Sequence, residues 1–213
     1  MRVTRVKFCG MTSPADVAAA VDAGADAIGV IVADSERRVT LEQAAEIARA
    51  VPPFVAAFAV VGDGDAASAG VLRSLGYTLQ FAGPTPPREC ALHSAGRRYV
   101  KVLHVALDGS LDPGVPGYSP RDYADALLLL DTSAPQKLGG TGKTFAWSFA
   151  RELARERPVA IAGGLSPANV GDCVRALRPF AVDVRSGIER DGRKDPTLMR
   201  DFVRAVRQAD ATA

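Results

Sequence analysis

The repeated alternation of apolar and helix-forming segments is the feature that most constrains the fold of this chain. Short runs rich in Val, Ile and Leu recur along its 213 residues, and most are followed by an Ala-, Leu-, Arg- and Glu-rich segment with helical spacing. The expected strands lie near 3–9, 26–32, 54–61, 77–81, 99–105, 126–131, 158–162 and 181–185. The expected helices lie near 14–23, 40–51, 65–75, 86–95, 119–124, 145–156, 167–178 and 196–208.

Eight strand–helix units predict an α/β protein with a single (β/α)8 TIM barrel, because a doubly wound sheet usually has only about five or six strands. The fifth unit has the weakest pattern, since "DGSLDPGVPGYSPRDYA" is mostly turn-forming before a very short helix. No segment resembles a linker long enough to separate two folded units. We therefore expect residues 1–213 to form one domain.

Charge and cysteine content exclude several classes of function. The chain has 26 basic and 24 acidic residues, a balance that does not argue for a nucleic-acid or membrane surface. The cysteines, Cys9, Cys90 and Cys173, form no C-x-x-C motif and lie near no histidine pair, so we expect a reducing cytoplasm and no zinc. The sequence shows neither a signal-peptide core nor an apolar run of roughly 18 residues, which also predicts a cytoplasmic protein.

The stretch "LLLLDTSAPQKLGGTGKTFAW" resembles a nucleotide-binding P-loop only superficially. The pattern G-x-x-x-x-G-K-[ST] would require a glycine at the position of Lys137. A P-loop nucleotidase is therefore disfavoured. Gly139, Gly140 and Gly142 are expected to form a lid or close-approach loop after the sixth strand, or else a simple connection.

Reactive side chains stand where a TIM barrel places catalytic groups, at the carboxyl ends of strands. Cys9 ends the first strand, and Lys7 nearby is expected to lower the pKa of its thiol and make it a usable base; a buried inert thiol is the alternative. Asp131 ends the sixth strand after four leucines, where apolar surroundings favour a protonated acid; a loop-capping carboxylate is the alternative. A thiol base and a carboxylic acid facing each other across the barrel mouth would suit a proton-transfer isomerisation.

Small residues follow the seventh and eighth strands. Gly163 and Gly164 precede the helix start "SPANV", and Ser186 and Gly187 follow the last strand. Ordinary turn residues are one explanation. Backbone N–H groups of two such loops also form a phosphate site in this fold, which is the function that we predict for them.

Four segments, "KFCGMTSPADVAAAVDAGADAIGVI", "LLLLDTSAPQKLGGTGKTFAW", "IAGGLSPANV" and "VDVRSGIERDGRKDP", resemble in order and spacing the phosphoribosylanthranilate isomerase family of tryptophan biosynthesis. The resemblance implies an intramolecular oxidoreductase that catalyses an Amadori rearrangement with no metal or organic cofactor. It implies that Asp131 protonates the furanose oxygen and that Cys9, accompanied by Lys7, removes the C2 proton. It also implies that Arg37 holds the anthranilate carboxylate.

The chain departs from that family at three strand ends. Gln80-Phe81-Ala82-Gly83 replaces the common Gln-Leu-His-Gly, "FAVVGDGD" replaces Val-Phe-Val-Asn, and Arg185 stands where a serine is common, close to the expected phosphate loops. A paralogue acting on another phosphorylated aminosugar therefore stays open, as does a phosphosugar-binding barrel with little turnover. We expect a small-molecule phosphosugar substrate, no nucleic-acid or membrane partner, and a monomer or homodimer.

Overall fold

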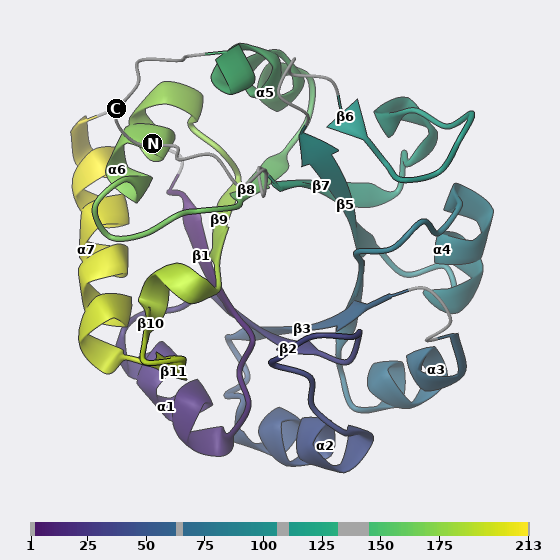
Figure 1. Cartoon of the computed structure of the whole chain (residues 1–213), viewed down its shortest axis with the longest axis horizontal. Coiled ribbons are helices and arrows are strands. Elements are labelled where there is room, and N and C mark those ends of the chain that lie inside the picture. Colours follow the sequence, from purple (N-terminus) through teal and green to yellow (C-terminus); the bar gives the residue numbers. More distant parts are fainter. Residues whose placement is uncertain (1–2, 63–65, 106–110, 132–144, 213) are drawn as a thin grey trace.

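The computed structural model describes residues 3–62, 66–105, 111–131 and 145–212. Within these ranges, eight parallel strands close into a barrel (Figure 1). The ring order is β4-β3-β2-β1-β9-β8-β7-β5, and pairing of β4 with β5 closes it, which confirms the expected (β/α)8 architecture. The strands are β1 (Arg5–Cys9), β2 (Ala27–Ile31), β3 (Ala56–Val61), β4 (Thr78–Phe81), β5 (Tyr99–Val105), β7 (Ala126–Asp131), β8 (Val159–Ala162) and β9 (Ala181–Val184).

Helices surround most of the barrel in Figure 1. Those of the described ranges are α1 (Pro14–Asp22), α2 (Leu41–Ala50), α3 (Ala66–Ser74), α4 (Pro87–His93), α5 (Phe145–Glu156), α6 (Val170–Leu177) and α7 (Pro196–Thr212). Hydroxyl side chains cap the first two, because Ser13 accepts from Asp16 N and Thr40 accepts from Gln43 N. None of the helices in these ranges is long and apolar enough to cross a membrane.

The helix expected at 119–124 is wrong, because the structure has only a 3-10 turn there, η1 (Pro120–Asp122). The preceding segment turns at Gly114 and Gly117, whose φ angles of 73° and 82° do not occur in an α-helix. A two-residue strand, β6 (Leu111–Asp112), pairs antiparallel with the end of β5. Turn-forming residues thus replace the fifth helix.

Side chains of the strands alternate between the barrel interior and the layer under the helices. On β1, Val6 and Phe8 belong to the outer core, where the Phe8 ring meets the Phe202 ring of α7 edge-on with 5.9 Å between centroids. Lys7 and Cys9 face the interior instead. The polar side chains of the barrel therefore come from the same alternation that builds its apolar exterior.

Several inward positions carry very small residues, although bulky branched residues usually fill such barrels. Ala27, Ala160 and Ala181 face the interior on three different strands. Gly29 follows on β2, where Lys7 and Cys9 occupy the space that a side chain would take. These small residues leave space inside the barrel.

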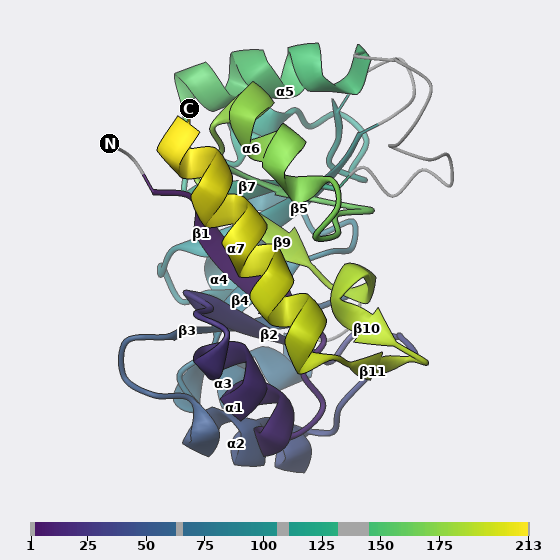
Figure 2. The same ribbon diagram turned by 90° about the vertical axis from the view of Figure 1, so that its left-hand side faces the viewer.

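A short insertion follows β9 before the last helix begins. It consists of the 3-10 turn η2 (Ser186–Ile188) and a hairpin of β10 (Glu189–Arg190) and β11 (Arg193–Lys194). Figure 2 shows this hairpin at the end of the barrel opposite the chain's amino terminus. Because β1 begins near that terminus, the hairpin lies at the carboxyl end of the strands, where this fold carries its chemistry.

Candidate active site

Cys9 and Asp131 are the last residues of β1 and β7. Cys9 is buried among Ile31 and Val60 inside the barrel. Asp131 continues the two-residue spacing of Leu127 and Leu129, which line the interior, so it lies on the same inner face of β7. Since β9 and β8 separate β1 from β7 in the ring, the thiol and the carboxyl group come to the barrel mouth from different sides.

A buried ion pair lies two residues before Cys9. Lys7 Nζ donates to Asp183 Oδ2 at 2.7 Å, and the two side chains are only 8% and 7% exposed. Lys7 and Asp183 are register partners on the adjacent parallel strands β1 and β9. Each charge is buried only because the other compensates it.

Gly29 on β2 makes room for both Lys7 and Cys9. A methyl group at Gly29 would come within 3.0 Å of Cys9 Sγ and 3.0 Å of Lys7 Nζ. Those distances are shorter than ordinary contacts, so a larger residue would force one of the two groups to move. The lysine and the thiol therefore share one small space that exists because position 29 has no side chain.

Burial and charge act in opposite directions on the Cys9 thiol. Burial raises the pKa of Cys9, Lys7 lowers it, the Asp183 carboxylate raises it again, and Lys194 lowers it. The net result is a pKa above the ordinary value, so the pKa decrease expected from Lys7 is wrong for this structure. Desolvation outweighs the cation. Burial lowers the pKa of Lys7, but Asp183 and Cys9 outweigh this effect and keep the lysine charged.

Arg37 is held in a two-point ion pair at the carboxyl end of the barrel. Its Nε and Nη2 donate to the two carboxylate oxygens of Glu189 at 3.3 and 3.0 Å. Lys194 also donates to Glu189, at 2.8 Å. Burial alone would raise the pKa of Glu189, but hydrogen bonds from Arg37 and Lys194 hold it below its ordinary value. The hairpin after β9 thus fixes the position of Arg37.

The loop after β1 lies between two cationic side chains. Gly10 has a φ angle of 75°, and a methyl group there would lie 3.3 Å from Arg185 Cγ and 3.7 Å from Arg37 Cβ. The structure therefore brings both arginines next to the residue that follows Cys9. The backbone carbonyl of Arg185 also accepts from Lys194 Nζ at 2.9 Å, which ties the end of β9 to the hairpin.

The loops after β8 and β9 are in direct contact. A side chain at Gly187 would overlap the carbonyl group of Leu165, so glycine is needed there for packing of one loop against the other. Gly163 and Gly164 have φ angles of 88° and 61°, and no atom of the described residues lies within 4 Å of where a Cβ of Gly164 would be. The predicted phosphate loops are adjacent in space, and Ser186 begins η2 within the second of them.

The Phe81 ring, at one of the departures from the family pattern, does not face the interior of the barrel. It belongs to the outer core and meets the Tyr99 ring edge-on, with 5.6 Å between centroids. Ala82 instead packs against the inner group of Cys9, Ile31 and Val60. The histidine-to-alanine difference therefore falls beside Cys9, whereas the leucine-to-phenylalanine difference falls outside the barrel.

Other sequence features contribute no site in the described ranges. Burial raises the pKa of both Cys90 and Cys173 to about 12, as for inert thiols. Within those ranges, no group of three or more His, Cys, Asp or Glu side chains is arranged to hold a metal ion. Gly139, Gly140 and Gly142 lie outside the described residues.

Sequence reasoning missed four residues of this arrangement: Gly29, Asp183, Glu189 and Lys194. One of them, Asp183, could have been found from the sequence. Side chains alternate between the two faces of a strand, so "AVDVR" places the Asp183 carboxylate on the same face as Arg185, a residue already assigned to the site. The other three become visible only when strand register and the hairpin bring them to Lys7, Cys9 and Arg37.

The chain is similar over nearly its whole length to known proteins. A family model described as N-(5'phosphoribosyl)anthranilate (PRA) isomerase matches residues 6–205. A relative from Leptothrix cholodnii named N-(5'-phosphoribosyl)anthranilate isomerase is 41% identical, with 98% of this chain and 93% of the relative covered. A relative of the same name from Trichlorobacter lovleyi is 40% identical, with 96% of this chain and 98% of the relative covered.

Solved structures give the same result. Phosphoribosyl anthranilate isomerase from Thermotoga maritima superposes with a TM-score of 0.80 at 31% identity, covering 97% of this chain and 100% of that one. A phosphoribosyl anthranilate isomerase in complex with reduced 1-(o-carboxyphenylamino)-1-deoxyribulose 5-phosphate gives a TM-score of 0.78 at 28% identity, with the same coverage. On the extent of the family match and the identity to these relatives, the chain belongs to the phosphoribosylanthranilate isomerase family.

Proposed function

We propose that this protein converts N-(5-phosphoribosyl)anthranilate to 1-(2-carboxyphenylamino)-1-deoxyribulose 5-phosphate, an Amadori rearrangement and an intramolecular oxidation–reduction. The observation that carries the proposal is the grouping of Cys9 with the buried Lys7–Asp183 pair at the end of β1, with Asp131 ending an inward face of β7. Such a site offers a base and an acid on different sides of the barrel mouth, as a two-step proton transfer requires.

The first step is opening of the sugar ring. Asp131 gives a proton to the furanose oxygen as the bond between that oxygen and C1 breaks. The nitrogen lone pair then forms the C1=N bond, which leaves a positively charged Schiff base. A carboxyl group at the end of β7, on the inner face of the strand, suits this role.

The second step is removal of the proton at C2 by Cys9. The electrons of that C–H bond form the C1=C2 bond of an enolamine, and the nitrogen regains its lone pair. Transfer of the hydroxyl proton from C2 to C1 then gives the ketone. No atoms are gained or lost, C1 is reduced and C2 is oxidised, so the chain needs no external redox partner for this chemistry.

The raised pKa of Cys9 has a mechanistic consequence. The buried thiol is protonated while Lys7 is the main cation beside it. A Schiff base cation formed in the first step would add a second positive charge close to the sulfur, and a nearby positive charge favours the thiolate. We propose that, after ring opening, the Cys9 thiol releases its proton to solvent and the resulting thiolate takes the C2 proton, which orders the two steps.

The anthranilate carboxylate and the phosphate of the substrate are proposed to bind two different groups of residues. Arg37 is proposed to hold the anthranilate carboxylate, with Glu189 and Lys194 keeping the guanidinium in place. The phosphate is proposed to bind backbone N–H groups of Gly163, Gly164, Ser186 and Gly187, with Arg185 assisting. The contact between the two loops supports this assignment.

A related substrate is the second candidate, and Ala82 is the observation that favours it. Its small side chain packs beside Cys9, where the family commonly has a histidine, so the site has more room and one polar group fewer at that point. A paralogue that acts on another phosphorylated aminosugar would have such a change.

The setting of the reaction is also a proposal. We propose that residues 1–213 act as one domain in the cytoplasm, as a monomer or homodimer, without a cofactor and without a nucleic-acid or membrane partner. One solved relative, from Thermotoga maritima, is described as a dimeric phosphoribosylanthranilate isomerase from which monomers were generated. Cytoplasmic location is supported by the free, buried state of Cys9, Cys90 and Cys173.

The test is direct turnover. N-(5-phosphoribosyl)anthranilate is generated enzymatically in situ, the purified protein is added, and loss of anthranilate-type fluorescence is followed. Rapid, protein-dependent loss is expected. Binding of the phosphosugar without turnover, or turnover only with a different phosphorylated aminosugar, would contradict the proposed reaction.

A further inference from the structure

A cavity of about 390 Å³ opens at the amino end of the barrel, opposite the candidate active site. Residues at or just before the starts of strands form its rim: Arg5, Asp26, Phe54 and Phe180. Its walls are mostly apolar and come from inward-facing side chains, including Ala27, Val100, Leu127, Leu129, Ala160 and Ala181. Both the volume and the lining are typical of a small-molecule site.

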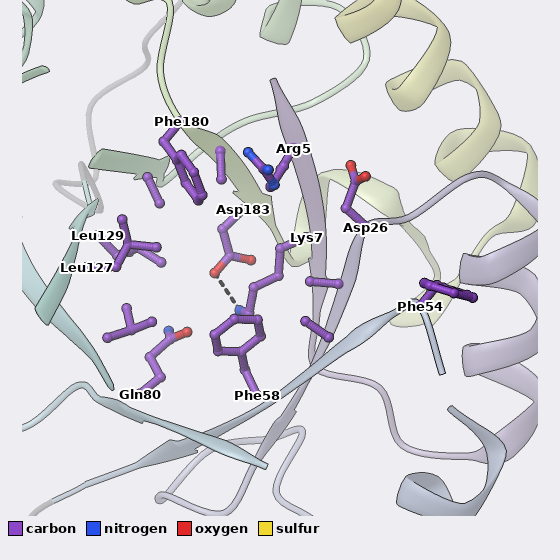
Figure 3. A pocket seen from close by; sticks show the side chains of 15 residues that line it. Arg5, Lys7, Asp26, Phe54, Phe58, Gln80, Leu127, Leu129, Phe180 and Asp183 are labelled. Carbon is purple, nitrogen blue, oxygen red and sulfur yellow. Dashed lines mark hydrogen bonds and ion pairs between the residues drawn. The ribbon is translucent and has the colours of Figure 1, made fainter. Parts of the chain in front are cut away.

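Two buried acceptor oxygens at the inner end of this cavity lack a hydrogen-bond partner within the part of the chain that the structure describes. Figure 3 shows Asp183, Gln80 and Phe58 grouped around the Lys7 ammonium group. Asp183 is 6% exposed and Gln80 is 5% exposed, yet among the described residues neither Asp183 Oδ1 nor Gln80 Oε1 has a hydrogen-bond partner. Buried polar atoms are almost always hydrogen-bonded, so these two oxygens indicate a place for donor groups.

The charges around the cavity specify what can enter it. Lys7 is paired with Asp183, and Asp26 accepts from Val6 N at 2.8 Å and from Arg207 at 3.1 Å. The Arg5 guanidinium lies 4.5 Å from the centre of the Phe180 ring. Lys7, Asp183 and Asp26 thus already have partners among the described residues, so a further charge buried beside them would have none there. A neutral molecule is favoured over an ion.

We propose that this cavity binds a neutral small molecule with an aromatic or aliphatic body and a hydroxyl or N–H donor. The body lies between the alanines and leucines of the walls, and the donor reaches Asp183 Oδ1 or Gln80 Oε1. The proposal does not rest on the isomerase reaction. Lys7 nevertheless links the cavity to the candidate active site, because it borders the cavity and lies beside Cys9.

The test uses benzyl alcohol as the probe and toluene as its counterpart without a donor. Chemical shifts of the backbone amides and of the Leu and Val methyl groups are followed by NMR as each compound is titrated, which a 22.3 kDa chain allows. Benzyl alcohol is expected to give saturable shifts at Leu127, Leu129 and Val100. Its affinity should exceed that of toluene by about 2- to 12-fold, the worth of one neutral hydrogen bond.

Cavity-filling variants locate the binding. Ala160→Leu fills the wall and Ala56→Leu, at an exposed position, fills the rim, so one of them remains informative if the other does not fold. Both should lose the saturable shifts, while Ala18→Leu, on the exposed face of α1, should keep them. No saturable binding, equal affinity for toluene, or unchanged binding in a folded filled variant would each overturn the proposal.

Discussion

Replacing Gly29 by alanine should disturb the Lys7–Cys9 arrangement with the smallest possible change. The new methyl group would lie 3.0 Å from both Cys9 Sγ and Lys7 Nζ, against roughly 3.5–4.0 Å for ordinary contacts. Neither the Lys7 nor the Cys9 side chain can easily move away from this methyl group. Lys7 is fixed by its 2.7 Å bond to Asp183, and the short side chain of Cys9 is packed against Ile31 and Val60.

The expected magnitudes follow from that overlap. Overpacking a core position costs about 1–3 kcal/mol. The loss of conformational freedom in the unfolded chain on changing Gly to Ala offsets about 0.4–1 kcal/mol of this. We therefore expect Gly29→Ala to lower the free energy of unfolding by up to about 2.6 kcal/mol. Moving a proton-transfer group by up to about 1 Å costs up to about 10²-fold in turnover. Turnover should fall about 10- to 100-fold, with little change in KM.

Urea unfolding and steady-state fluorescence kinetics measure the two effects. Gly70→Ala is the matched control, because Gly70 lies in the helix α3 and the nearest atom of the described residues to its added methyl group is 4.0 Å away. That variant should gain about 0.5–1 kcal/mol and keep full turnover. If Gly29→Ala also keeps full turnover and stability, the crowding inferred between positions 7, 9 and 29 does not exist in solution.

Three further predictions concern Arg37, Gly164 and Cys173. Arg37→Ala should mainly raise KM, because it removes one charge-assisted contact worth about 1.5–3 kcal/mol of binding free energy. Arg38→Ala should leave KM unchanged. The opposite result would place the carboxylate contact one residue later. Gly164 has a left-handed backbone that asparagine tolerates, and its added side chain would meet open space among the described residues. Gly164→Asn should therefore weaken phosphosugar binding but leave the thermal midpoint of unfolding nearly unchanged. Unaltered affinity would reject this phosphate site. The pKa of Cys173 is raised from 9.0 to about 12, so its contribution to stability is full below pH 9 and is lost as pH rises toward 12. The free energy of unfolding should therefore fall with pH less steeply for Cys173→Ala than for the parent protein between about pH 9.5 and 11, under reducing conditions. The two slopes should differ by up to about 1.4 kcal/mol per pH unit. Equal slopes would refute the raised pKa.

Strand–helix alternation was sufficient to predict the barrel, because each strand carries its apolar run locally. The helix expected at 119–124 failed for a local reason as well, since glycines at positive φ precede a proline-led 3-10 turn. Placement of Cys9 and Asp131 at the carboxyl strand ends also followed from the sequence.

The remainder of the site depends on contacts between distant segments. Asp183 meets Lys7 through the register of two strands that lie far apart in the sequence. Glu189 reaches Arg37 through a hairpin that carries no strong sequence signal. The net pKa of Cys9 depends on how much solvent the barrel removes from the thiol, which neighbouring residues in the sequence do not report.

The division of roles between Cys9 and Asp131 is the central claim. Turnover of N-(5-phosphoribosyl)anthranilate by Cys9→Ser and by Asp131→Asn tests it most directly. Cys90→Ser is the thiol control, because a serine hydroxyl can replace the bond from the Cys90 thiol to the Thr85 carbonyl. Each of the two site variants should lose roughly 10²- to 10⁴-fold in turnover with little change in substrate binding, and the control should keep full activity. Near-full turnover by folded Cys9→Ser would mean that another group is the base and that this thiol is an inert core residue.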